Sequence, residues 1–166
     1  ELRRVLLPST CITYLPIYPL RFEPIFPSRL WGGPHLADWS DQPLPDGPIG
    51  EAWLLSDRID NPSRVSDGPL KGQTLAQLIE RSPTCLLGKL ALQFKRFPLL
   101  LKFLDVSKML SVQVHPSAAH PKLIPQGESG KTEGWVVLTA RPTARIYAGL
   151  KPGVPAEALR TRSLQT

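Results

Sequence analysis

The sequence predicts a mainly β protein. Nineteen prolines and twelve glycines punctuate the chain, most densely between residues 16 and 70, and such frequent breaks favour short strands and turns over long helices. In "LSVQVHP" the apolar Leu110, Val112 and Val114 alternate with polar residues, which is the period of a strand. Further strands are predicted at residues 18–26, 51–57, 134–140 and 144–150, and an apolar run covers residues 97–106.

A small helical part is expected between these strands. In "TLAQLIERSP", Leu75, Leu78 and Ile79 share one helical face, Thr74 is a suitable N-cap, and the helix stops before Pro83. A second helical piece is predicted over residues 83–92. Residues 29–50 are predicted to form a loop with one short helical turn at Pro34–Trp39.

Length and charge limit the possible functions. The 166 residues suffice for one globular domain. Twenty Lys and Arg against fourteen Asp and Glu give a net charge of +6, which suits an anionic partner such as a phosphate ester. These basic residues are dispersed, so no nucleic-acid surface is predicted. Nothing in the sequence indicates an oligomeric state.

The cysteines and apolar stretches indicate the compartment. Cys11 and Cys85 form no CxxC pair and are too few for a disulfide scaffold, which favours a reducing, cytoplasmic setting. Pro8, Pro16 and Pro19 interrupt the apolar start of the sequence. We therefore expect neither an export signal nor a membrane span.

Residues of types that can bind a metal ion occur in the middle of the sequence. On a strand, Ser111, Gln113 and His115 would lie on one face, so Gln113 and His115 could ligate one divalent ion, with Glu133 as a nearby carboxylate. Taken alone, such a Gln-x-His pair is more often structural or merely exposed than a metal site. His35 and His120 are interpreted as exposed loop residues, and Glu51 and Trp53 as support for their strand.

A nucleotide-binding P-loop is excluded. "GESGKT" ends like the motif GxxxxGK[ST], but the position of its first glycine is Pro125, and a strand rather than a helix is predicted to follow.

Four segments, taken together and in this order, are a more specific indication of a metal site than the Gln-x-His pair alone. They are "YPLRFEPIFPSRLWGG", "PIGEAWLLSD", "FPLLLKFLDVSKMLSVQVHP" and "GKTEGWVVL". Together they resemble the amino-terminal part of type I mannose-6-phosphate isomerase, a zinc-dependent cupin family. The resemblance runs from about Tyr18 to about Val154. It implies a cupin-type, jelly-roll-like β-barrel with a small helical insertion, incomplete at its carboxyl end, and one zinc ion held by Gln113, His115 and Glu133.

The resemblance also implies a substrate and a reaction. Lys102, Lys131 and Ser111 would line the sugar-phosphate site, and the two lysines are the candidate catalytic residues. On the residues alone, each could instead be structural: Lys102 a snorkelling side chain, Ser111 a satisfied hydroxyl and Lys131 a loop cation. The implied reaction interconverts mannose 6-phosphate and fructose 6-phosphate through an enediol.

The family pattern is not complete in this sequence. Family members carry a fourth zinc-ligating histidine and an arginine farther downstream, and "PAEALRTRSLQT" after Val154 contains no histidine. We therefore expect an extension that does not match the family at residues 1–17, the amino-terminal part of a cupin-type catalytic domain at 18–154, and a tail or truncated continuation at 155–166. We also expect little isomerase activity from these residues alone. The alternative is a non-catalytic cupin-like domain that binds a metal or a sugar phosphate.

Overall fold

The computed structural model describes residues 15–16, 18–124 and 130–163. By its internal contacts the chain divides into two compact units, Glu1–Leu110 and Ser111–Thr166, which are described separately. The predicted extension at residues 1–17 lies almost entirely outside the described residues. None of the helices within the described ranges has the length and apolar character needed to cross a lipid bilayer.

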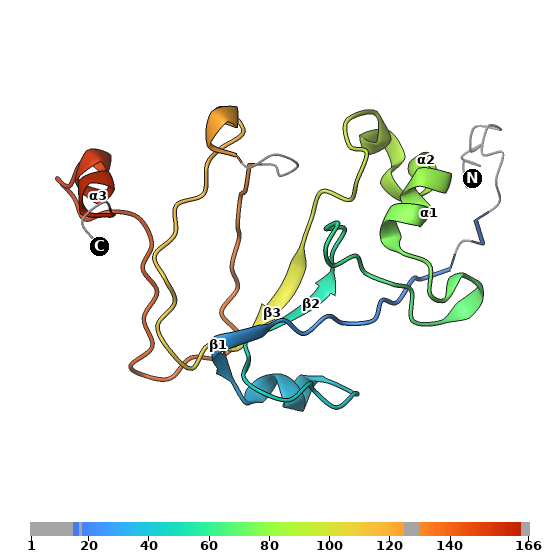
Figure 1. The fold of residues 1–166 in the computed structure, drawn as a ribbon, viewed down its shortest axis with the longest axis horizontal. Helices are drawn as coiled ribbons and strands as arrows, with labels where there is room; N and C mark the ends of the chain where they lie inside the picture. Colours follow the sequence, from blue (N-terminus) through green and yellow to red (C-terminus); the bar gives the residue numbers. More distant parts are fainter. Residues whose placement is uncertain (1–14, 17, 125–129, 164–166) are drawn as a thin grey trace, which may run out of the picture. The chain divides into compact units, whose positions relative to one another are not determined.

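The first unit is built around a two-stranded antiparallel sheet of β2 (Glu51–Leu55) and β3 (Leu101–Leu104), drawn in cyan and yellow in Figure 1. Trp53 is the partner of Lys102 in this ladder, and Ala52 the partner of Phe103. The predicted strand at 51–57 and the apolar run at 97–106 each contain one of these strands. Because side chains alternate along a strand, Ala52 and Phe103 face one side of the sheet while Trp53 and Lys102 face the other.

A third strand was not predicted. β1 (Ser28–Gly33) forms over "SRLWGG", and all of it after Ser28 was predicted to belong to the loop at 29–50. Single bridges hold it: Ser28 and Gly33 each pair with Ile49, and Gly32 pairs with Val106. Conversely, the strand predicted at 18–26 is reduced to two isolated bridges, at Phe22 and Ile25. Pro24 interrupts that segment and removes a backbone donor, so a continuous ladder cannot form there.

Three of the helical segments of the first unit lie where the sequence predicts them. α1 (Leu75–Arg81) begins after a capping box, in which the Thr74 hydroxyl accepts from the Gln77 amide at 3.2 Å and the Gln77 side chain accepts from the Thr74 amide at 2.9 Å. The second helical piece is α2 (Pro83–Leu87) followed by the 3-10 helix η3 (Gly88–Leu92). The turn expected at 34–39 is the 3-10 helix η1 (His35–Trp39), and a further 3-10 turn is η2 (Gly68–Leu70).

Three groups of buried apolar side chains form the core of the first unit. Leu36, Ile49 and Ala52 pack between η1 and β2, and partly buried Phe103 joins them. Two further groups lie against α1, with Leu78 and Ile79 almost fully buried. The apolar face predicted for this helix is therefore a core contact. The two remaining groups consist of Leu15, Val65, Leu70 and Leu78, and of Leu75, Ile79 and Leu87.

The second unit differs from the prediction. The segments at 110–116, 134–140 and 144–150 are extended but form no strand, and only η4 (Pro121–Leu123) and α3 (Ala156–Ser163) are regular among its described residues. None of its described side chains is buried, and Val112, Val114, Val136 and Ile146 are largely exposed. An alternating pattern gives a strand only where another strand completes the hydrogen-bonded ladder, and the described part of this unit supplies no such partner.

Two consequences follow for the predicted architecture. The described residues do not form a closed barrel, because their only ladder has two strands. The tail expected at 155–166 contains the helix α3, which the sequence analysis missed; "AEALR" after Pro155 consists of good helix formers and was the available signal.

Candidate functional site

The predicted metal ligands of the second unit lie on two extended segments that meet near Pro116. The amide of Lys131 donates a 3.3 Å hydrogen bond to the carbonyl of Pro116. Gly130 packs so closely against the backbone of Ala118 that a Cβ atom would lie 2.5 Å from the Ala118 nitrogen. The absence of a side chain at position 130 therefore lets the segment carrying Lys131 and Glu133 approach the one carrying His115.

His115, Lys131 and Glu133 form one polar cluster. Nε2 of His115 lies 3.3 Å from Oε2 of Glu133. Nζ of Lys131 lies 2.7 Å from Oε1 of Glu133 and 3.2 Å from Nε2 of His115. The His115 and Glu133 side chains are each about one-third exposed. The cluster thus combines an imidazole, a carboxylate and an ammonium within reach of solvent.

The geometry of this cluster suits a small cation. Two ligands bound at about 2.0–2.2 Å to one tetrahedral zinc ion lie roughly 3.4 Å apart, close to the 3.3 Å between His115 and Glu133. The Lys131 ammonium already contacts both residues, so a positive charge is accommodated between them. The donor set fits zinc, since a neutral imidazole and a carboxylate are both ordinary zinc ligands.

Gln113 and Ser111 form a separate contact. Nε2 of Gln113 donates to Oγ of Ser111 at 2.9 Å, and both side chains are exposed. Because the amide nitrogen makes this bond, Oε1 of Gln113 is the atom suited to bind a metal. Within the described residues, no group of three or more His, Cys, Asp or Glu side chains is placed to hold a metal ion. The predicted ligand set includes only two residues of those types, with a glutamine as the third.

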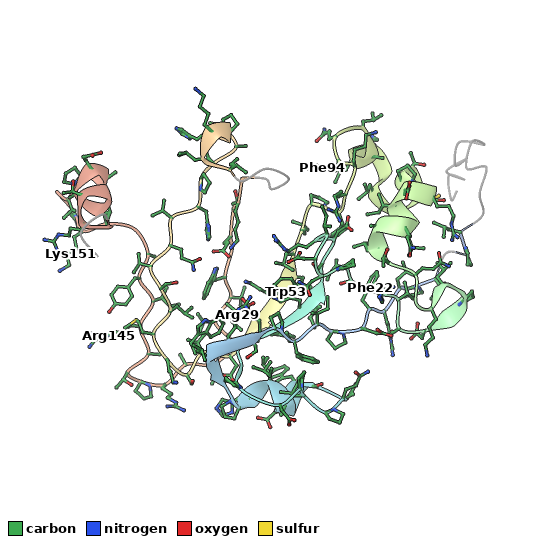
Figure 2. All side chains as sticks on the ribbon, in the orientation of Figure 1. Phe22, Arg29, Trp53, Phe94, Arg145 and Lys151 are labelled. Carbon is green, nitrogen blue, oxygen red and sulfur yellow. The ribbon has the colours of Figure 1, made fainter. Side chains whose placement is uncertain are left out.

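Lys102 belongs to the first unit and has different partners. Its Nζ atom lies 2.8 Å from Oε1 of Glu51, which is on the neighbouring strand. The other carboxylate oxygen, Oε2 of Glu51, lies 2.8 Å from Nη2 of Arg29 and accepts a 3.0 Å hydrogen bond from Nε1 of Trp53. Figure 2 labels Arg29 and Trp53 near the three strands. Glu51 therefore joins β1, β2 and β3 through a single buried carboxylate.

The electrostatics of Glu51 follow from these contacts. Burial raises the pKa of Glu51, but hydrogen bonds from Lys102 and Trp53, with the positive charges of Lys102 and Arg29, outweigh it. The net result is a pKa below the ordinary value of 4.5. Glu51 is thus a buried, ionised carboxylate, whereas the sequence analysis gave it only the role of supporting its strand. Arg29 was not singled out there, and no local pattern connects it with Glu51.

The remaining histidines lie outside these clusters. His120 contacts the hydroxyl of Ser117 at 3.3 Å, and His35 lies 3.6 Å from the carboxylate of Asp38. Both histidines are exposed, as predicted.

One hollow of the first unit lies away from Lys102. A cavity of about 340 Å³ opens on the side of the sheet that carries Ala52 and Phe103, and Phe22, Phe26 and Trp39 contribute to its lining. Lys102 and Glu51 do not line this cavity. It therefore gives no support to a sugar-phosphate site at Lys102.

Comparison with known proteins identifies the family. Residues 20–134 match the family described as phosphomannose isomerase type I, catalytic domain. The chain belongs to this family. The matched range includes every predicted site residue of both units, from Lys102 to Glu133.

Proteins named as mannose-6-phosphate isomerases are similar to this chain. The chain is 40% identical over 132 residues to a probable mannose-6-phosphate isomerase, GmuF, of Bacillus subtilis, covering 80% of this chain and 41% of that protein. It is 40% identical over 131 residues to the mannose-6-phosphate isomerase ManA of the same organism, covering 79% and 40%. The mannose-6-phosphate isomerase of Streptococcus mutans is 37% identical over 131 residues, with the same coverage.

A solved structure is also similar. The crystal structure of the mannose 6-phosphate isomerase from Bacillus subtilis matches with a TM-score of 0.60 and 36% identity, over 67% of this chain and 34% of that one. The chain thus spans about 40% of the length of the curated relatives it matches.

Proposed function

We propose that this chain forms part of a zinc-dependent aldose–ketose isomerase that interconverts mannose 6-phosphate and fructose 6-phosphate. The family match supports the substrate and the reaction. The observation that carries the metal assignment is the 3.3 Å approach of His115 to Glu133, with a cation already in contact with both. Residues 18–154 would be the amino-terminal part of a cupin-type catalytic domain, and a cytoplasmic location is consistent with a sugar-phosphate substrate.

The proposed metal ligands are Gln113, His115 and Glu133, which leave one position of a tetrahedral ion for a further ligand. Oε1 of Gln113, Nε2 of His115 and a carboxylate oxygen of Glu133 are the donor atoms. When bound, zinc supplies a Lewis acid that polarises and orients the sugar oxygens. Metal binding would separate the Lys131 ammonium from the His115 imidazole, because the ammonium and the zinc ion both need the lone pair on Nε2 of His115.

The other proposed roles belong to polar side chains of both units. The reaction moves a proton between adjacent carbons, so it needs a group that accepts and returns a proton, and cations that hold the phosphate dianion. Lys131 is the candidate in direct contact with the metal ligands, and Lys102 is the second candidate for proton transfer or phosphate binding. Ser111, bonded to Gln113, is placed to orient that ligand and to offer its hydroxyl to the sugar.

Metal analysis tests this assignment. We expect about one zinc per chain after equilibration with the metal and dialysis, and weaker binding by at least about tenfold in His115→Ala and Glu133→Gln, because each change removes a ligand. His120→Ala is the matched control: it removes an exposed histidine of the same unit that contacts Ser117 instead. Equal zinc content in all four proteins would exclude the proposed ligands.

A coupled assay of fructose 6-phosphate formation tests the reaction in the intact protein. Turnover that depends on zinc and is lost in His115→Ala supports the isomerase. Zinc and sugar-phosphate binding without turnover would favour the non-catalytic cupin-like alternative.

A further inference from the structure

The turn that follows α2 in the first unit carries three exposed apolar side chains. The amides of Gln93 and Phe94 both donate to the carbonyl of Leu90 at 2.9 Å, which closes residues 90–94 into one compact turn. Figure 2 labels Phe94 on this segment, called the apolar turn below. Leu92 is 91% exposed, Leu90 46% and Phe94 38%. Single exposed apolar residues are common on protein surfaces, but three within five residues form a patch that needs an explanation.

The exposure of these side chains does not come from a loosely attached turn. Ala91 and Phe97 pack against one of the buried apolar groups beside α1. The amide of Phe97 also donates a 2.8 Å hydrogen bond to Oδ2 of Asp57, a buried carboxylate. The inner side of the apolar turn is therefore fixed to the core, and its other apolar side chains are held toward solvent.

The charges around the apolar turn are all positive. From residue 81 to residue 104 the sequence contains no Asp or Glu, and its charged residues are Arg81, Lys89, Lys95, Arg96 and Lys102. Arg96 lies 3.5 Å from the carboxylate of Asp57, and Lys102 pairs with Glu51. Lys89 and Lys95 are exposed, and they stand on either side of the apolar turn. The exposed apolar side chains are therefore flanked by two cations.

This combination fits an anionic lipid surface better than a protein partner. Segments that attach to the surface of a bilayer bury apolar side chains at the headgroup boundary and place Lys or Arg against anionic lipids, and stable attachment needs both signals. A stable protein interface instead takes about 20–30 residues from each partner and is depleted in lysine. A short turn with lysines at both ends and a leucine that is 91% exposed has the first character rather than the second.

We propose that the apolar turn is a membrane-surface attachment site for bilayers that contain anionic lipids. Leu90, Leu92 and Phe94 enter the headgroup boundary, and Lys89 and Lys95 pair with the lipid phosphates. This is attachment at the surface and not a membrane span. The inference does not depend on the proposed isomerase reaction, so the two can fail separately.

Co-sedimentation of the whole chain with lipid vesicles tests the proposal. We expect the chain to bind mixed phosphatidylcholine–phosphatidylglycerol vesicles at least about fivefold more strongly than vesicles of phosphatidylcholine alone, because the two lysines add an electrostatic attraction. Added salt should reduce this difference, since it screens exposed charges. No binding to the mixed vesicles, or equal binding to both kinds, would overturn the proposal.

Leu92→Ser tests the apolar contribution. It is expected to weaken binding to the mixed vesicles by at least about fivefold, because it removes the most exposed of the inserted side chains. Ile59→Ser is the matched control: Ile59 is 77% exposed in the same unit, but it is followed by Asp60 and lies outside the apolar turn. Equal losses in the two variants would mean unspecific adsorption of apolar side chains and would contradict the assignment.

Lys89→Gln and Lys95→Gln test the electrostatic contribution. Each is expected to weaken binding to the mixed vesicles by at least about twofold and to leave binding to phosphatidylcholine unchanged. All the substituted side chains are exposed, and circular dichroism verifies that each variant folds. Sedimentation velocity without lipid tests the competing occupant, a second copy of the chain. Self-association that is lost in Leu92→Ser, with no vesicle binding by the original chain, would refute the lipid site.

Discussion

Nζ of Lys131 lies 2.7 Å from Oε1 of Glu133, and the same nitrogen lies 3.2 Å from Nε2 of His115. A lysine thus contacts two of the three side chains assigned to the metal. The ammonium and a zinc ion would compete for the same lone pairs on the His115 nitrogen and the Glu133 oxygens. Replacing Lys131 is therefore expected to affect zinc binding.

Lys131→Met is expected to leave zinc affinity intact or to raise it by up to about fivefold, while the isomerase activity proposed for the intact protein falls. The ion pair is partly exposed, and such pairs contribute about 0–1 kcal/mol, which sets this limit. Zinc affinity is measured by competition with a chromogenic chelator. Lys122→Met, another lysine substitution in the same unit, is the control. A large loss of zinc affinity in Lys131→Met would show that Lys131 supports the ligands rather than competing with the metal.

The stability of the first unit is expected to depend on pH through Glu51. The pKa of Glu51 is lowered in the folded state from its ordinary value of 4.5, so the unfolded chain binds its proton first as pH falls. The stabilisation is therefore fully present above about pH 4.5 and is lost as pH falls through the lower, folded-state pKa.

Urea unfolding of the original chain and of Glu51→Gln measures this effect. At pH 7 the substitution is expected to cost about 1–3 kcal/mol, because it weakens the bonds to Lys102, Arg29 and Trp53. The difference between the two proteins should shrink as pH falls below about 4.5. A difference that stays constant down to pH 3 would contradict an ionised Glu51 as its source.

The sequence predicts those elements whose signals are local. The signals for helix α1 all lie within a few residues of one another: Thr74 is its N-cap, Gln77 is the capping partner, and Leu78 belongs to its apolar face. β1 could not be found in this way, because its partners, Ile49 and Val106, lie far along the chain. Without knowledge of these partner residues, the two glycines of "WGG" indicate a turn rather than a strand.

The candidate site shows the same limit. Residue types and the family resemblance point to Gln113, His115 and Glu133, but neither determines that the Lys131 ammonium contacts two of them. The cluster of Glu51 with Arg29 depends on strands brought together by tertiary structure. In the second unit, alternation alone predicts strands that the described residues do not form, because a strand requires a partner.

Thr74→Ala is expected to destabilise the first unit by about 1 kcal/mol. The substitution removes the hydroxyl that accepts the Gln77 amide hydrogen and so opens the capping box at the start of α1. Thermal unfolding measures the loss. Thr84→Ala is the control, since Thr84 is an exposed residue within α2. Equal midpoints for the two variants would argue against a stabilising cap.

Gly32→Ala is expected to destabilise the first unit by about 1–3 kcal/mol, the usual cost of overpacking. A Cβ atom at this position of β1 would contact the carbonyl carbon of Ile49 and lie 2.5 Å from the Gly50 nitrogen. Both are backbone atoms, so the contact cannot be relieved by rotating a side chain, and β1 must move away from the chain leading into β2.

Gly134→Ala is the control for this substitution, because a Cβ atom there has no neighbour within 4 Å. Urea unfolding followed by tryptophan fluorescence compares the two variants with the original chain. A Gly32→Ala protein as stable as the original would mean that β1 does not pack this closely against Ile49.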